Sequence, residues 1–376
     1  MILAIDIGTT FLKVAVVNYT GELLFFEKQA VSVDYVDSKK QVDPTSWKDV
    51  LQSISSGIDI KLLGKVEAVV VSGNGPTLVP VGSNGKPTSD ALLWLDTQSS
   101  SLFNELLEKT GEPIPPNFFL GKAYWFMKER EDLYLKSDKF LSCPEYICYL
   151  LTDELFTLLP HPGFLKFYWT NEQIEKLGLD PLKFPPYINY NEIYGKLNNN
   201  SIINGVNIGT PVICGGPDFI MSLLGTGSID YGIICDRTGT SEGINYCSNQ
   251  LINIPGLRTL PHIADNLFTI SGLIPESGNY ILNGEEHKLL IEYKAIIDKM
   301  ILSGFDIKEI RLIGGHANIE ALNIEKSKLY DIPLKIYSEG SDLIGNAVLG
   351  SIVIKKYSSF KEACQNMIRE KICYNI

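Results

Sequence analysis

The chain has 376 residues, of which 45% are hydrophobic and 20% are charged, and its formal net charge is −11. This length favours two domains with ample core, and the acidic balance excludes the broad basic surface with which proteins hold nucleic acid. No apolar run approaches the roughly 18 residues of a membrane span, and no basic signal-peptide leader opens the chain, so we expect a cytoplasmic protein without a nucleic-acid or membrane partner.

The first seventy residues predict a strand-rich start, because short apolar runs alternate with breaks that contain Gly or Asn. Three strands are expected, at 2–5, 12–17 and 22–26. A helix is expected around 47–58, with Pro44 at its start. The next strand, 67–72, is closed by the breaker cluster Gly73-Asn74-Gly75-Pro76. Polar and helical material is then expected to about residue 205.

Near residue 209 the pattern of strands and glycine turns begins again. Strands are expected at 211–214, 231–235, 243–247 and 310–313. A helix is expected at 285–302, another after Gly314-Gly315, and two more helical stretches at the end of the chain. Because each half contains a strand, a glycine turn and a second strand, the sequence predicts a duplicated architecture.

The first glycine turn, Gly8-Thr9-Thr10, is a candidate phosphate-binding loop. Glycine allows the backbone N–H groups of such a turn to approach an anion closely, and the two hydroxyls add donors. Asp6 comes directly before it at a strand end, where a carboxylate could hold Mg²⁺ through water. The alternative is a plain β-hairpin, which is common.

A second loop of the same kind, Gly239-Thr240-Ser241, lies in the other half of the chain. A nucleotide triphosphate held between two domains needs one loop from each, so the pair favours phosphate binding over two unrelated hairpins. A third candidate is Gly314-Gly315, whose glycines could let a flat adenine lie against the backbone. His316, which follows, is interpreted as a turn residue.

Asp218 is the candidate catalytic base, since an apolar strand ending in Gly215-Gly216 delivers it to a sheet edge. Such a carboxylate can accept the proton of an attacking hydroxyl in phosphoryl transfer. The alternative is a helix N-cap, and the two roles are compatible. Trp94 and Asp96 could line a polar pocket, although core packing is the commoner role of a tryptophan.

The cysteines and histidines indicate neither disulfides nor a histidine-rich metal site. The seven cysteines are scattered and form no Cys-x-x-Cys pair, which is typical of buried reduced thiols in a cytoplasmic protein. The four histidines are not at metal-ligand spacing: His161, His262, His287 and His316.

The order of these motifs closely resembles that of the FGGY carbohydrate kinases, within the superfamily of sugar kinases, actin and chaperone ATPases. The resemblance runs nearly end to end and rests on seven segments, at 6–13, 72–96, 121–131, 145–152, 215–218, 239–241 and 314–315. It implies an α/β fold of two ribonuclease-H-like (actin-like ATPase) domains around a central cleft. The domains would be 1–222 and 223–376, the second of them shortened.

The resemblance also implies an ATP-dependent kinase that uses Mg²⁺ and phosphorylates a hydroxyl of a small-molecule sugar or polyol, and a homodimer is compatible with it. It assigns Asp218 as the base and Asp6 to the metal. It assigns the nucleotide to Gly8, Thr9, Thr10, Lys13, Gly239, Thr240, Ser241, Gly314 and Gly315, and the sugar to Asn74, Gly75, Trp94 and Asp96.

The chain departs from the family pattern in the sugar pocket and in the second half. Gln98 stands where relatives often have arginine, and Phe219 where a polar residue usually follows the base. A long family segment is missing between Gly284 and the helix at Glu285. The sequence therefore leaves two rivals open: a catalytically weak relative that binds ATP or sugar as a sensor or regulatory protein, and a bare actin-like ATPase.

Overall fold

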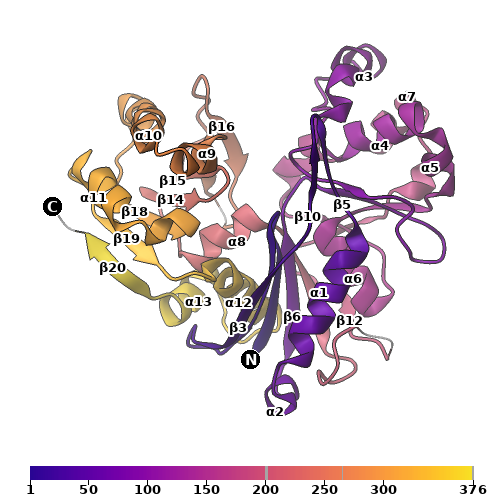
Figure 1. The fold of residues 1–376 in the computed structure, drawn as a ribbon, viewed down its shortest axis with the longest axis horizontal. Helices are drawn as coiled ribbons and strands as arrows, with labels where there is room; N and C mark the ends of the chain where they lie inside the picture. The colour runs from indigo at the N-terminus through magenta and orange to yellow at the C-terminus, as the bar shows by residue number, and fades with distance from the viewer. Residues whose placement is uncertain (200–201, 265, 375–376) are drawn as a thin grey trace. The chain divides into compact units, whose positions relative to one another are not determined.

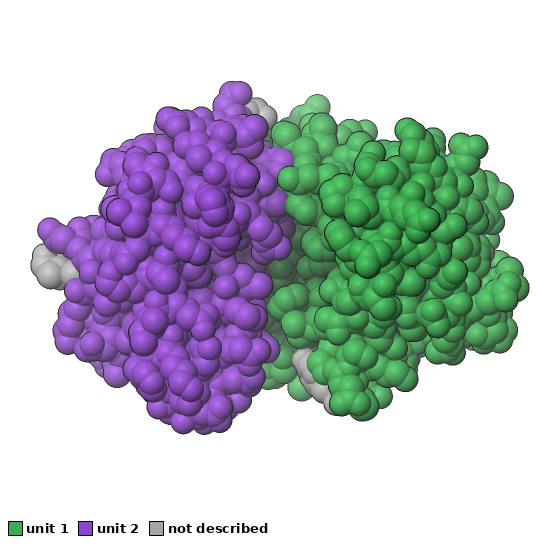
Figure 2. All heavy atoms as spheres, turned by 90° about the horizontal axis from the view of Figure 1, so that it is seen from above, with its two compact units in different colours: residues 1–218, 349–356 green, residues 219–348, 357–376 purple. Residues whose placement is uncertain are grey.

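The computed structural model describes residues 1–199, 202–264 and 266–374 (Figure 1). They form two compact units. Unit 1 comprises Met1–Asp218 and Leu349–Lys356, and unit 2 comprises Phe219–Val348 and Tyr357–Ile376 (Figure 2, green and purple).

The main sheet of unit 1 has six strands in the order β12-β13-β6-β1-β2-β3. β1, β2 and β3 form an antiparallel meander, β6 pairs in parallel with β1, and β13 pairs in parallel with β6. Both β1 and β6 are buried along their whole length, which is why each begins with four consecutive apolar residues, before the buried polar side chains of Asp6 and Ser72. The strands are β1 (Ile2–Ile7), β2 (Phe11–Val17), β3 (Leu23–Ala30), β6 (Ala68–Gly73), β12 (Gly195–Lys196) and β13 (Pro211–Pro217).

Two helices show how local sequence fixes the ends of elements in unit 1. α1 (Pro44–Ser56) begins with the expected proline, and the side chain of Asp43 caps it by accepting from the Thr45 N–H at 2.9 Å. α6 (Cys143–Thr152) begins with a capping box. The remaining helices of the unit are α2 (Ile60–Leu63), α3 (Phe103–Thr110), α4 (Phe119–Glu129), α5 (Glu131–Lys136), α7 (Asn171–Leu177), η1 (Gln98–Leu102), η2 (Pro162–Phe167) and η3 (Pro181–Lys183).

A second sheet of unit 1, in the order β4-β5-β8-β7-β9, lies largely where the sequence predicted polar and helical material. That prediction was wrong because these strands are two to four residues long and too short to show alternation. Its strands are β4 (Asp34–Val36), β5 (Lys39–Val42), β7 (Leu78–Val81), β8 (Ala91–Leu92) and β9 (Lys139–Ser142), and a separate pair is β10 (Thr157–Leu159) with β11 (Tyr187–Asn189).

The sheet of unit 2 has seven strands in the order β16-β17-β15-β14-β18-β19-β20. Within it, β17-β15-β14-β18-β19 repeats the order and directions of β3-β2-β1-β6-β13, so the predicted duplication is confirmed. The sequence missed four of these strands: β16, β17, β19 and β20. The bounds are β14 (Ile233–Thr238), β15 (Glu242–Ser248), β16 (Arg258–Pro261), β17 (Phe268–Ile274), β18 (Glu309–Gly314), β19 (Leu334–Tyr337) and β20 (Glu370–Tyr374).

Helices of unit 2 cover this sheet, and the expected helix at 285–302 is present as α10. In the hydrophobic core of unit 2, apolar side chains of α10 pack with those of β14, β15 and β17. The helices are α8 (Asp218–Gly225), whose first residue belongs to unit 1, α9 (Ser277–Leu282), α10 (Glu286–Leu302), η4 (Gly315–Asn318), α11 (Glu320–Lys328), α12 (Ser341–Val353), which continues into unit 1, and α13 (Phe360–Met367).

His262 makes unit 2 sensitive to acid. Its Nδ1 accepts from the Ala264 N–H at 2.9 Å, so the ring is neutral and Nε2 donates to the Ser228 carbonyl at 3.0 Å. Burial lowers the pKa of His262 to about 4, against the Ser228 hydrogen bond. The unfolded state therefore binds more protons than the folded state between pH 6.5 and 4. The free energy of unfolding decreases as the pH is lowered through this range.

We expect wild type to lose up to about 3 kcal/mol relative to His262→Gln as the pH falls from 7 to 4. Urea denaturation followed by circular dichroism at both pH values measures the difference. Other titrating groups act equally in both proteins and cancel in the comparison. A stability difference that does not change with pH would refute this role of His262.

Candidate active site

Three adjacent parallel strands of unit 1 end at the same sheet edge, and the candidate catalytic residues lie there. In the strand register Asp6 pairs with Ser72, and Gly216 pairs with Ser72 from the other side. Asp218 follows two residues later, as the first residue of α8. The structure thus brings Asp6 and Asp218 to one edge, where the carboxyl ends of parallel strands form ligand sites in α/β folds.

The first candidate phosphate loop is the tight turn between β1 and β2. The Gly8 N–H donates to the Phe11 carbonyl at 3.0 Å. A Cβ at residue 8 would lie 2.6 Å from that oxygen, so the turn requires glycine. Thr9 is half-buried and its Oγ1 accepts from Nε1 of Trp94 at 2.9 Å, whereas Thr10 is exposed. The loop is therefore a hairpin, and Trp94 of a later segment holds it in place through this hydrogen bond.

Asp6 has the surroundings of a carboxylate that could hold a metal ion. It is buried, Oδ1 accepts from Ser72 Oγ at 2.8 Å, and Oδ2 lies 3.4 Å from Nζ of Lys13. Among the described residues, no group of three or more His, Cys, Asp or Glu is placed to hold a metal. One carboxylate fits Mg²⁺ in a nucleotide site, since this ion keeps several waters and takes its other ligands from the phosphates.

The half-buried Asp218 shares a neighbour with Asp6. Burial raises the pKa of the Cys143 thiol well above its usual value, and the carboxylates of Asp218 and Asp6 raise it further. Both carboxylates therefore act on one buried side chain. The strand before Asp218 has an irregular register between Cys214 and Gly216, which re-aims the chain at this edge.

The predicted sugar-binding residues differ in how many hydrogen bonds their side chains already form within the protein. Asn74 is buried, donates from Nδ2 to the Ile7 carbonyl at 2.9 Å and accepts from the Thr77 hydroxyl. Asp96 is fully buried and accepts from the Lys40 N–H, the Gln98 N–H and the Gln98 side chain at 2.9, 3.1 and 2.9 Å. Trp94 is half-buried beside the phosphate loop.

Lys122 lies in the segment 121–131 that carries part of the family resemblance, but no role at the site was assigned to it from the sequence. It lies on α4, is fully buried, and donates to the carbonyls of Pro76, Leu93 and Leu92 at 2.6, 2.7 and 3.3 Å. Burial lowers its pKa to about 7, and the charge of Asp96 opposes the shift. Lys122 thus ties together the two segments that carry the predicted sugar-binding residues. A lysine inside the buried run 119–126 was the available signal.

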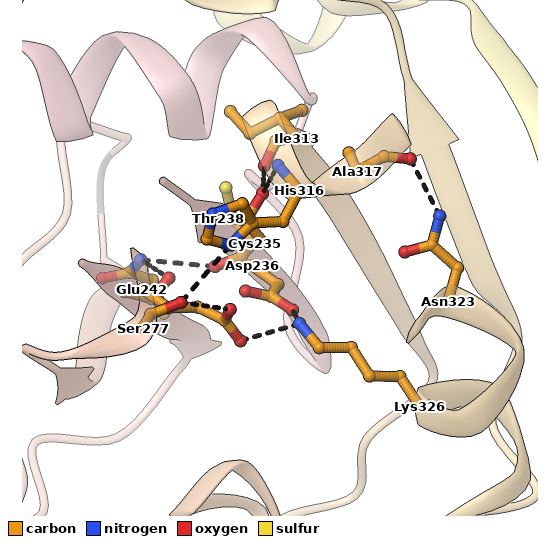
Figure 3. A network of polar contacts seen from close by, with 12 residues as sticks. Cys235, Asp236, Thr238, Glu242, Ser277, Ile313, His316, Ala317, Asn323 and Lys326 are labelled. Carbon is orange, nitrogen blue, oxygen red and sulfur yellow. Dashed lines mark hydrogen bonds and ion pairs between the residues drawn. The ribbon is translucent and has the colours of Figure 1, made fainter. Parts of the chain in front are cut away.

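In unit 2 the structure brings the two remaining predicted loops together (Figure 3). Thr238 pairs with Gly314 in the register, its Oγ1 donates to the Ile313 carbonyl at 2.9 Å, and the same Oγ1 accepts from the His316 N–H at 3.1 Å. Gly314 has φ of 100°, and a Cβ there would lie 1.9 Å from the Thr238 carbonyl oxygen. The glycine is therefore required where the loop at 314–315 meets the end of β14.

The chain matches a family model described as "FGGY family of carbohydrate kinases, N-terminal domain" over residues 1–225. Among curated relatives, a xylulose kinase of Staphylococcus xylosus is 28% identical over 251 residues, which are 61% of this chain and 51% of the relative. A gluconokinase of Bacillus subtilis is 24% identical over 264 residues, 64% of this chain and 51% of the relative. The chain thus spans about half the length of these relatives.

Solved structures with a similar fold cover the whole chain. The ligand-bound xylulose kinase of Lactobacillus acidophilus has a TM-score of 0.83 at 16% identity, over 100% of this chain and 93% of the other. A glycerol kinase of Plasmodium falciparum with ADP has a TM-score of 0.81 at 15% identity, over the same shares. The α/β fold of two ribonuclease-H-like, actin-like ATPase domains is confirmed. Within the ranges given above, no helix combines the length and the apolar character that a membrane crossing requires.

Proposed function

The chain belongs to the FGGY family of carbohydrate kinases, and from this we propose that it transfers the γ-phosphoryl group of ATP to a hydroxyl of a sugar or polyol. The observation that carries the proposal is the position of Asp218 at the sheet edge of unit 1 that also carries Asp6 and the Gly8 loop. Six buried cysteine thiols support a cytoplasmic setting.

Asp218 is the proposed general base. Its carboxylate accepts the proton of the acceptor hydroxyl while that oxygen forms a bond to the γ-phosphorus, and the bond from phosphorus to the bridging oxygen of ADP breaks. Backbone N–H groups of the loop at 8–10, with the hydroxyls of Thr9 and Thr10, orient the transferred group. Positioning and charge stabilisation account for most of the catalysis in this reaction class.

Further residues are proposed to bind the nucleotide and the acceptor. Asp6 holds Mg²⁺, which when bound neutralises charge on the phosphates, and Lys13 lies beside it. Asn74, Gly75, Trp94 and Asp96 form the acceptor pocket, and the buried Asn74 and Asp96 shape its loops through their hydrogen bonds. In unit 2, Gly239, Thr240 and Ser241 bind phosphate, and Gly314 and Gly315 bind adenosine.

The hydrogen bond from Trp94 to Thr9 connects the proposed acceptor pocket with the phosphate loop. Trp94→Phe keeps an aromatic ring but removes the N–H donor. We expect KM for Mg-ATP to rise roughly three- to tenfold, the value of one neutral hydrogen bond. Initial-rate kinetics measures the change, with Trp125→Phe on α4 as the control. Equal KM values in Trp94→Phe and wild type would show that this hydrogen bond does not contribute to nucleotide binding.

Release of ADP in the presence of Mg-ATP and a panel of acceptors tests the proposed function. The panel starts from the compounds named for similar proteins, xylulose, gluconate and glycerol, and extends to other ketoses, sugar acids and polyols. We expect one class of acceptor to stimulate ADP release strongly. Binding of ATP without turnover on any acceptor, or hydrolysis indifferent to all of them, would contradict the proposal.

A further inference from the structure

A fully buried ion cluster lies behind the loops of unit 2 that we assign to the nucleotide (Figure 3). Nζ of Lys326 lies 2.8 Å from Oδ2 of Asp236 and 2.7 Å from Oε1 of Glu242. None of the three side chains is exposed to solvent. Lys326 also lies over the ring of Tyr293 on α10, 4.4 Å from its centroid.

The cluster holds both ends of the loop Gly239-Thr240-Ser241. Asp236 is on β14, three residues before the loop, and Glu242 is the first residue of β15, directly after it. Lys326 comes from α11, the helix that follows the loop at 314–315. One ammonium group thereby links the two strands that carry one nucleotide loop to the helix that follows the other.

A second connection runs from the cluster to the adenosine loop through Ser277. The Ser277 hydroxyl donates to Oε2 of Glu242 at 3.2 Å, and it lies 3.4 Å from Nδ1 of His316. His316 is half-buried in η4, and its backbone N–H is bonded to Thr238. Figure 3 shows dashed lines from the Ser277 side chain to both Glu242 and His316.

The composition of the cluster argues against a purely stabilising role. Burying two carboxylates and one ammonium costs several kcal/mol per ion, and apolar residues of similar volume often stabilise a core as well or better. Burial and the charge of Glu242 raise the pKa of Asp236 to about 7 against the opposing effect of Lys326. A cluster of this cost is explained better by what it positions.

We propose that Asp236, Glu242 and Lys326 are positioning residues for nucleotide binding, which fix the loops at 239–241 and 314–316 relative to each other through Ser277 and His316. The inference rests on the function proposed above and deepens it, because it assigns adenine-nucleotide affinity to residues that do not touch the nucleotide. Small displacements of the two loops weaken their hydrogen bonds to the nucleotide, and each neutral hydrogen bond is worth roughly a three- to tenfold change in affinity.

Two variants test the proposal while keeping the fold. Ser277→Ala breaks the link between Glu242 and His316 without leaving a buried charge unpaired, and Glu242→Gln removes one charge at nearly constant shape. Lys326→Met is less suitable, because it would leave two carboxylates without their cation. The control is Lys335→Met on β19, which removes ion pairs of 2.7 and 3.3 Å with Glu309 and Glu370 from the same sheet.

The readout is the Kd of ADP from calorimetry, together with the melting temperature of each variant. We expect Kd to rise roughly three- to tenfold in Ser277→Ala and about ten- to a hundredfold in Glu242→Gln, where a charged hydrogen-bond partner is lost, with no change in Lys335→Met. In turnover with the acceptor found by the panel, KM for Mg-ATP should rise while kcat and KM for the acceptor stay within about twofold.

The outcomes separate this inference from the proposed function. If wild type binds ADP and both variants bind it equally well, the positioning role is overturned and the kinase assignment stands. Weakening of equal size in Lys335→Met would also overturn it, because general destabilisation of unit 2 would then be the cause. A wild-type protein that does not bind ADP would contradict both.

Discussion

Replacement of Asp218 by asparagine is expected to lower kcat by about two to four orders of magnitude, the usual contribution of a general base. Asparagine has nearly the same shape and keeps a hydrogen-bonding oxygen, but it cannot accept the proton of the acceptor hydroxyl. The Kd of ADP should stay unchanged, because the carboxylate acts on the acceptor and not on the nucleotide. Steady-state kinetics and calorimetry on the same preparation measure both quantities.

The control for this variant is Asp132→Asn, which makes the same chemical change on α5 at a side chain that is 61% exposed. It should retain wild-type kcat. If Asp218→Asn turns over as fast as this control, Asp218 is not the base and another group must accept the proton. A loss of ADP affinity in step with kcat would instead indicate a disturbed site.

Lys122→Met is expected to destabilise unit 1 by about 3 kcal/mol, because three buried carbonyl groups lose their hydrogen-bond donor. It should also lower activity, because Lys122 no longer joins the segment that contains Pro76 to the segment that contains Leu93. All four tryptophans, Trp47, Trp94, Trp125 and Trp169, lie in unit 1. Tryptophan fluorescence during urea denaturation therefore reports the unfolding of this unit alone.

Lys128→Met provides the matched comparison on the same helix. Lys128 is 42% exposed and pairs with Glu105 at 3.1 Å, so its loss should cost about 1 kcal/mol or less. Equal stabilities of the two methionine variants would show that the contacts of Lys122 contribute no more than a surface ion pair.

The strands that carry the phosphate loops could be predicted from the sequence because they are buried on both faces. The apolar runs of β1, β6 and β13 are each about four residues long, and Asp6, Ser72 and Gly215 end them. The duplication was also predictable, since β14 and β15 repeat this pattern around Gly239. For Asp218, local sequence could not choose between a helix cap and a base, and its place as the first residue of α8 at the sheet edge fits both.

The rest of the site depends on contacts between residues far apart in the chain. Lys326 reaches Glu242 and Asp236 across 84 and 90 residues, and no local pattern marks such a meeting. Lys122 lies in one of the segments that carry the resemblance, but its carbonyl partners belong to other segments and could not be predicted. The sheet from β4 to β9 was missed because tertiary pairing, and not propensity, makes strands of so few residues.

The fate of the γ-phosphoryl group tests the central claim most directly. The protein is incubated with Mg-ATP labelled in the γ-phosphate and with the acceptor that stimulates ADP release most, and the products are separated. We predict that the label appears in a phosphorylated sugar or polyol in an amount equal to the ADP formed. Label found only in inorganic phosphate, or left entirely in ATP with every acceptor of the panel, would contradict the assignment as a carbohydrate kinase.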